Sequence, residues 1–125
     1  MTVLDTSILV SCFAEPAQHM PALLRAVDSG EDFILPALVL YEWLRGPRRL
    51  AELKAQEALL PAVSAIPFGS DEAAIAARLY REVSQPRNRE VDICIAACAI
   101  LRKAQLWTLN RDDFKDIPGL RLAKF

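Results

Sequence analysis

The sequence predicts a single α/β domain with a mostly parallel sheet of about five strands between helices. Short apolar runs rich in strand formers alternate with longer amphipathic segments along the 125 residues, and this alternation is typical of parallel strands joined by helices. Single prolines and glycines mark the element boundaries, and no repeat, low-complexity segment or linker divides the chain. The length is enough for one domain with its own buried core.

The first half of the chain is expected to hold two strands and four helices. In order these are a strand at 3–5, helices at 6–14 and 16–30, a strand at 33–36, and helices at 37–46 and 47–60. The helices are predicted from apolar residues that recur at helical spacing. Gly30 and Gly46 are expected to end two of them, and Pro47 suits the first turn of the helix that follows.

The second half is expected to hold three strands and two helices. In order these are a strand at 62–68, a helix at 71–84, a loop at 85–90, a helix at 91–104, a strand at 106–110, a turn or short helical piece at 111–114, and a strand at 120–125. Ser70, with Asp71 and Glu72 after it, is a good helix start. The helix at 91–104 is almost wholly apolar, so we expect it to be central.

Composition excludes several classes of protein. The net charge is −1, so there is no overall basic footprint for nucleic acid. No apolar run approaches the roughly 20 residues of a membrane span, and the N-terminus lacks the basic region of a signal peptide; a cytoplasmic protein is therefore expected. The three cysteines, Cys12, Cys94 and Cys98, lie in apolar surroundings, and with His19 as the only histidine they suggest buried residues rather than disulfides or zinc ligands.

Polar residues follow two of the predicted strands. Asp5 ends the first strand, and Asn110, Asp112 and Asp113 follow LWTL of the fourth strand. In open parallel sheets, functional groups gather beyond the carboxyl ends of the strands. Each residue alone has a simpler explanation, because Asp5 can cap the next helix and the two later aspartates can cap a turn or lie in solvent.

Two further carboxylates interrupt apolar helices. Glu42 lies within ALVLYEWL, and Asp92 lies near the start of VDICIAACA. Burying an unpaired carboxylate costs several kcal/mol. Arg45 is close enough along the helix to pair with Glu42, and Asp92 could cap the helix that it opens. Together, however, three or four converging acids without a cationic cluster favour a divalent cation, and oxygen ligands select Mg²⁺ or Mn²⁺. Such an ion would activate a water for phosphodiester hydrolysis.

Four segments of the chain carry a family resemblance: VLDTSILV, ALVLYEWLRG, EVDICIAACAILRKAQLWTLNRDDF and IPGLRL. They resemble the PIN domain family, and specifically the toxin ribonucleases of VapBC toxin–antitoxin systems. The resemblance covers essentially the whole chain, residues 1–125. It implies a Mg²⁺-dependent endoribonuclease that cleaves single-stranded RNA. It also implies a homodimer and an antitoxin partner whose C-terminal segment covers the active-site groove.

The resemblance assigns roles by position. Asp5 and Asp92 match metal-binding aspartates, Glu42 matches the middle acid, and Thr6 matches a hydroxyl expected to steady the Asp5 carboxylate or a bound water. The fourth acidic position falls on Asn110, which departs from the four-acid pattern.

Either Asn110 or Asp112 could fill that fourth position. Asp112 is the preferred charged replacement, and it completes the predicted catalytic set of Asp5, Glu42, Asp92 and Asp112. Asp113 is the second choice, with a supporting role.

Local arginines acquire a possible role beside such a site. Five of them flank the acidic segments: Arg45, Arg48, Arg49, Arg87 and Arg89. They could hold RNA phosphates, lie in solvent or contact an antitoxin. The predicted RNA contacts are Arg45, Arg48, Arg87 and Arg89.

Two other functions are open: an inactive PIN-like module that binds RNA or protein, which Asn110 favours, and a haloacid-dehalogenase-type phosphatase, which Ser7 disfavours because that chemistry needs an acid there.

Overall fold

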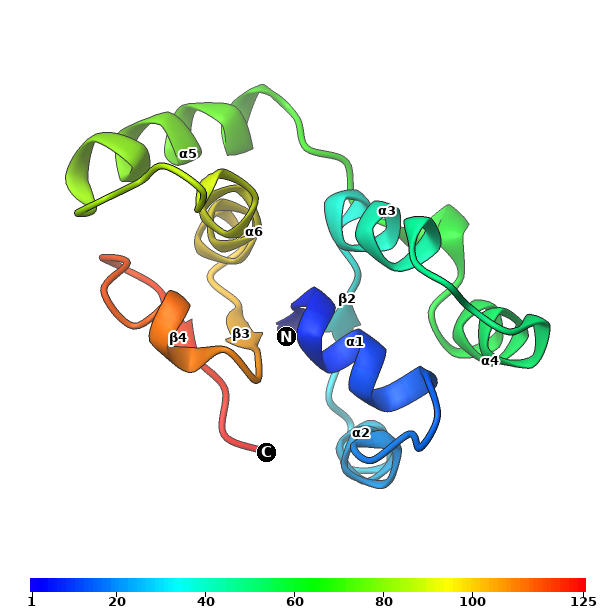
Figure 1. Cartoon of the computed structure of the whole chain (residues 1–125). Helices are drawn as coiled ribbons and strands as arrows, with labels where there is room; N and C mark the ends of the chain where they lie inside the picture. Colours follow the sequence, from blue (N-terminus) through cyan, green and yellow to red (C-terminus); the bar gives the residue numbers. More distant parts are fainter.

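A computed structural model describes all residues, 1–125, and contains a parallel sheet of four strands among six helices (Figure 1). The strands are β1 (Thr2–Leu4), β2 (Phe33–Ile34), β3 (Gln105–Trp107) and β4 (Arg121–Leu122), in the order β2-β1-β3-β4. Each neighbouring pair is parallel, and Val3 is paired with Ile34 on one side and Leu106 on the other. The predicted α/β class with a parallel sheet is therefore confirmed.

The six predicted helices are all present. They are α1 (Thr6–Phe13), α2 (Met20–Asp28), α3 (Ala37–Arg45), α4 (Leu50–Leu59), α5 (Ser70–Glu82) and α6 (Glu90–Leu101), together with two 3-10 turns, η1 (Ala62–Ser64) and η2 (Arg111–Asp113). Figure 1 shows α5 and α6 on one side of the molecule and α3 and α4 on the other, with α1 between them. None of the helices is long and apolar enough to cross a bilayer.

The strand predicted at 62–68 is wrong in extent. Only Ile66 joins the sheet, through a single parallel bridge to Pro36 next to β2. Its N–H donates to the Leu35 carbonyl at 2.9 Å, and its carbonyl accepts from the Ala37 N–H at 2.8 Å. Pro67 has no N–H to continue the ladder, so the fifth strand is reduced to one residue.

The core surrounds β1 and α6. Thr2, Val3 and Leu4 are all at most 1% exposed, so both faces of β1 are covered, as in parallel sheets with helices on either side. In α6 the run from Ile95 to Ala99 is buried without interruption, which confirms that this helix is central. Burial raises the pKa of the Cys12 thiol to about 12 and that of Cys98 to about 11, so both stay protonated.

The sheet is extended in opposite directions from β1, first by β2 and later by β3. The chain places β2 on one side of β1, whereas β3 and β4 lie on the other. Such a reversal leaves a crevice at the carboxyl ends of the two central strands, where ligands of open α/β sheets bind. Asp5 follows β1 directly and Thr108 follows β3, so both residues lie at this crevice.

Candidate active site

Asp5 is buried at the end of β1 and is held by two hydroxyl groups. The residue is almost inaccessible, at 3% exposure. The backbone N–H of Asp5 donates to the Trp107 carbonyl at 3.0 Å, one step beyond the β1–β3 ladder. Its Oδ2 accepts hydrogen bonds from Ser7 Oγ at 2.8 Å and Thr108 Oγ1 at 2.7 Å. Asp5 occupies the N-cap position of α1 but makes no side-chain capping bond, so the helix-cap explanation fails.

Ser7 and Thr108 were missed as site residues by sequence reasoning. The two hydroxyl oxygens lie 3.2 Å apart. Ser7 Oγ accepts from the Leu109 N–H at 3.0 Å, and Thr108 Oγ1 accepts from the Asn110 N–H at 3.0 Å. These bonds fix the loop after β3 to the start of α1. Ser7 could have been identified because it lies two residues after Asp5 in the sequence. Thr108 could not, because it lies far from Asp5 along the chain.

Glu42 lies on α3 and contacts α1. The Thr6 hydroxyl donates to Glu42 Oε1, so Thr6 supports this carboxylate and not that of Asp5. The other carboxylate oxygen, Oε2, lies 3.5 Å from Arg45 Nη2, an ion pair along one face of α3. Arg45 is more than half exposed and also lies over the Tyr41 ring at 5.3 Å. Such an exposed pair is weak, and the charge of Glu42 also acts on Asp92.

Asp92 is the carboxylate with the most perturbed acidity. It lies in the first turn of α6, whose N-cap is Arg89, so Asp92 is not the cap. Its half-buried carboxylate has no hydrogen-bond partner or ion pair. Burial raises its pKa to about 6, and the negative charges of three further acids, Asp5, Asp113 and Glu42, add to the rise. Carboxylates at the end of β1, in α3 and in η2 therefore repel that of Asp92.

The two aspartates of η2 differ in their surroundings. Asp112 is 91% exposed and pairs with Lys115 at 3.2 Å. Asp113 is close enough to Asp92 for its charge to raise the pKa of that group. Asn110 is exposed and forms the N-cap of η2, where its side chain makes no capping bond. We refer to Asp5, Glu42, Asp92 and Asp113 as the acidic cluster.

The acidic cluster suits a hard divalent cation. No three of its side chains are already placed as a ready ligand set, but Mg²⁺ in proteins is commonly bound by one or two carboxylates and several waters. Burial is the largest cause of the raised pKa of Asp92, the neighbouring negative charges add to it, and the positive charge of Arg89 acts to lower that pKa. A bound cation would relieve this repulsion.

Polar hollows adjoin the cluster. One, of about 380 Å³, is lined by Leu109, Asn110, Arg111, Asp112 and Asp113. Another, of about 250 Å³, includes Ser7 and Ser11 of α1 among its lining residues. Leu109 lines the first and Ser7 the second, and Asp113 of the acidic cluster lines the first.

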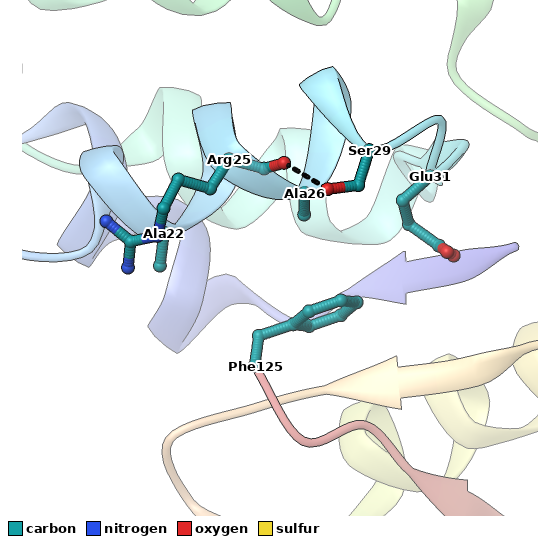
Figure 2. A pocket seen from close by; sticks show the side chains of 6 residues that line it. All are labelled: Ala22, Arg25, Ala26, Ser29, Glu31 and Phe125. Atoms are coloured by element: carbon teal, nitrogen blue, oxygen red, sulfur yellow. Dashed lines mark hydrogen bonds between the residues drawn. The ribbon is translucent and has the colours of Figure 1, made fainter.

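A separate pocket lies between α2 and Phe125. It measures about 300 Å³ and is lined by Ala22, Arg25, Ala26, Ser29, Glu31 and Phe125 (Figure 2). Its only acid, Glu31, already pairs with the N-terminal amino group at 3.1 Å and accepts from the Thr2 hydroxyl at 2.7 Å. This pocket therefore lacks the carboxylate pair that a divalent cation needs.

The five arginines have different surroundings. Arg48 donates to the Trp43 carbonyl at 2.9 Å and lies 4.2 Å from the centroid of the Trp43 ring. Arg89 is bound to Asp116 at 2.6 Å. Arg87 and Arg49 are exposed, and their side chains make no ion pair. Of the four residues predicted to contact RNA, Arg48 and Arg89 thus make intramolecular contacts, Arg45 pairs with Glu42, and Arg87 is unengaged.

Comparison with known proteins gives relatives of the whole chain. The chain is 36% identical to a protein named Ribonuclease VapC19 from Mycobacterium tuberculosis, over 124 residues that cover 97% of this chain and 98% of the relative. The same match is found in two strains of that organism.

Solved structures share the fold at lower identity. VapBC2 from Rickettsia felis, bound to a promoter DNA fragment, matches with a TM-score of 0.75 at 21% identity and covers 99% of this chain and 98% of its own. DNA-bound VapBC from Salmonella typhimurium gives 0.76 at 20% identity, with 98% and 96% covered. FitAcB from Neisseria gonorrhoeae gives 0.71 at 22% identity, with 98% and 97% covered. Together with a match of the PIN domain family to residues 2–120, these findings show that the chain belongs to the PIN domain family.

Proposed function

We propose that this chain is a metal-dependent endoribonuclease that hydrolyses single-stranded RNA and acts as the toxin of a toxin–antitoxin pair. The observation that carries the proposal is the acidic cluster, in which the charges of Asp5, Glu42 and Asp113 all act on Asp92, beside the crevice between β1 and β3 where Asp5 lies. Membership of the PIN domain family and the ribonuclease name of the 36% identical relative support it.

Mg²⁺ is the proposed cofactor, and Mn²⁺ can replace it. Asp5 and Asp92 would hold the ion, because Asp5 lies at the crevice, its charge acts on Asp92, and Asp92 lacks any other partner. When bound, the ion supplies Lewis-acid activation of water and neutralises charge on the phosphate. Two carboxylates leave most of the coordination sphere of Mg²⁺ to water and substrate oxygens.

The chain's own residues would orient the reaction. Ser7 and Thr108 fix the Asp5 carboxylate through its Oδ2, which leaves Oδ1 for the ion. Thr6 holds one oxygen of Glu42, so that Glu42 can accept a hydrogen bond from the attacking water. Such support of ligating groups by neighbouring side chains is general in metal sites.

Asp113, rather than Asp112, is proposed as the fourth acid. Its charge acts on Asp92, whereas the almost fully exposed Asp112 pairs with Lys115. With Asp113 in this role, Asn110 removes no acid from the cluster. The inactive-module alternative therefore loses the feature that favoured it. Ser7, bonded to Asp5, offers no acid of the kind that a phosphatase would need.

The proposed partners follow from the same relatives. The solved neighbours include VapBC complexes, and we infer an antitoxin that covers the crevice, together with a homodimer of this chain. RNA phosphates would be attracted by Arg87, which is exposed and whose side chain makes neither an ion pair nor a hydrogen bond within the protein.

Expression with and without the candidate antitoxin tests the proposal. Growth should arrest when the chain is expressed, and co-expression of the adjacent short open reading frame should relieve the arrest. The purified chain should cleave single-stranded RNA with Mg²⁺, and a chelator should abolish cleavage. Asp92→Asn should remove both effects, while Asp112→Asn serves as the matched control. If the parent chain causes no growth arrest and cleaves no RNA, the inactive RNA- or protein-binding module would be favoured instead.

A further inference from the structure

Arg89 joins three segments of the chain through one guanidinium group. Nη1 donates to the Ser84 carbonyl at 2.9 Å and to Asp116 Oδ2 at 3.0 Å. Nη2 donates to the Asp113 carbonyl at 2.9 Å and to Asp116 Oδ1 at 2.6 Å. The pair with Asp116 is a bidentate fork, which is the strongest geometry for an arginine and a carboxylate. We call Arg89 and Asp116 the clamp.

The clamp connects the two elements that carry half of the acidic cluster. Arg89 is the N-cap of α6, three residues before Asp92, and it bonds the backbone of Asp113 in η2. No other hydrogen bond or ion pair joins residues 84–92 to residues 108–118. Arg89 therefore makes every hydrogen bond and ion pair between the segment that carries Asp92 and the segment that carries Asp113.

The clamp is not needed to attach η2 to the core. Phe114 and Ile117, which follow η2, are 1% and 4% exposed and lie in the hydrophobic core. Their burial anchors the segment whether or not the clamp forms. What the clamp adds is the orientation of the polar end of η2, where Asp113 lies.

Arg89 has little capacity left for RNA. All four terminal N–H groups donate within the protein, and only Nε–H remains. The Arg89 side chain is 19% exposed. Its hydrogen bonds to Asp116 raise the pKa of Arg89 and lower that of Asp116, so the pair stays ionised.

We propose that Arg89 is a positioning residue, which with Asp116 holds Asp113 beside Asp92 so that the acidic cluster is assembled before the metal ion and RNA arrive. The inference rests on the proposed nuclease function. It predicts that breaking either half of the clamp weakens divalent-ion binding and the chemical step without weakening RNA binding.

Mn²⁺ binding to the RNA-free protein is the first test. Arg89→Met and Asp116→Ala should each raise the Kd for Mn²⁺ about tenfold or more, as is typical when groups that orient ligands are lost. The matched controls, Arg78→Met and Glu82→Ala, break an exposed pair on α5 whose atoms lie 3.8 Å apart, and they should leave Kd within about twofold of the parent value. Unchanged Kd in Asp116→Ala, whose side chain is 40% exposed, would overturn the proposal even if Arg89→Met does not fold.

Steady-state kinetics on single-stranded RNA separates positioning from RNA contact. Both clamp variants should lower kcat about tenfold or more and change KM less than about twofold. The double variant should lower kcat no more than either single variant does, because each single variant already breaks the same clamp. A raised KM with unchanged kcat in Arg89→Met would overturn the proposal and identify an RNA contact. If the parent chain cuts no RNA, the proposed function fails. The comparison of Mn²⁺ affinities alone then decides whether the clamp positions Asp113.

Discussion

The Thr108 hydroxyl donates a 2.7 Å hydrogen bond to Asp5 Oδ2, between residues 103 positions apart. The bond crosses the crevice between the two central strands, β1 and β3. It orients the carboxylate of a residue that is only 3% exposed, and it leaves the other oxygen, Oδ1, without a hydrogen bond. Hydrogen bonds of this kind, from a neighbouring side chain to a ligating carboxylate, set the geometry of metal sites.

Thr108→Val should reduce both activity and stability. Valine keeps the shape of threonine but leaves Asp5 Oδ2 and the Asn110 N–H each short of a partner. Loss of a buried hydrogen bond to a charged group costs about 1.5–3 kcal/mol, and we expect cleavage to fall about tenfold. Urea unfolding and RNA cleavage measure the two effects. Thr108→Ser, which keeps the hydroxyl, is the control, and equal losses in both variants would contradict the role of the hydrogen bond.

Asp92→Asn should stabilise the metal-free protein at neutral pH. In the unfolded chain Asp92 ionises near the ordinary aspartate pKa of 3.8, whereas in the folded protein its pKa is about 6. The folded state therefore binds more protons between these values, and stability falls as pH rises through this window. We expect a gain of about 1–2 kcal/mol at pH 7–8, reduced by the water that reaches this half-buried group.

Urea unfolding in a chelator at pH 4 and pH 7.5 measures this effect. The gain should be present at pH 7.5 and absent at pH 4, where Asp92 is protonated in the folded protein. The same variant should be inactive as a nuclease. A variant that is equally stable or less stable than the parent at pH 7.5 would show that Asp92 is not destabilised by burial and its acidic neighbours.

Asp113→Asn and Asp112→Asn form a matched pair that identifies the fourth acid. Both variants remove one negative charge from the same 3-10 turn. Asp113→Asn should lower RNA cleavage by about a hundredfold and lower the pKa of Asp92, because one repelling charge is gone. Asp112→Asn, which loses only an exposed pair with Lys115, should stay within about twofold of the parent. The reverse order would assign the role to Asp112.

The fold class and the larger elements could be predicted from the sequence. Helices such as α6 have apolar patterns that depend on local spacing alone, and Asp5 and Asp92 could be found because a carboxylate in an apolar run has a high cost of burial. The strand at 62–68 was lost because Pro67 removes a backbone donor. Pairing with a neighbouring strand, which decides such cases, is not visible in a local pattern.

Contacts between distant segments could not be predicted. The preference for Asp112 over Asp113 depends on how η2 is rotated toward α6, and residue spacing does not report that rotation. Arg89 was expected to contact RNA, yet its guanidinium is taken up by Asp116 and two carbonyls. Ser7 and Thr108 gain their role only when β1 and β3 lie side by side.

Divalent ions should stabilise the parent chain against thermal unfolding. An ion that binds only the folded state at a hundredfold excess over its Kd adds about 2.7 kcal/mol. Mg²⁺ and Mn²⁺ should therefore raise the Tm of the parent, and Ca²⁺ should do so less because a site of few carboxylates suits it poorly. Asp5→Asn and Asp92→Asn should lose the shift, whereas Asp112→Asn should keep it. An equal shift in all variants would place the ion elsewhere.

Arg87→Ala and Arg48→Ala should separate RNA binding from folding. Arg87 is exposed and makes no ion pair, so its loss should raise KM and reduce the slope of log affinity against log salt concentration by about one, with unchanged stability. Arg48 contacts the Trp43 carbonyl and ring, so Arg48→Ala should cost about 1–2 kcal/mol of stability with no change in the salt slope. RNA binding measured at several salt concentrations, together with urea unfolding, distinguishes the two. An unchanged slope in Arg87→Ala would leave this arginine as a solvated surface residue.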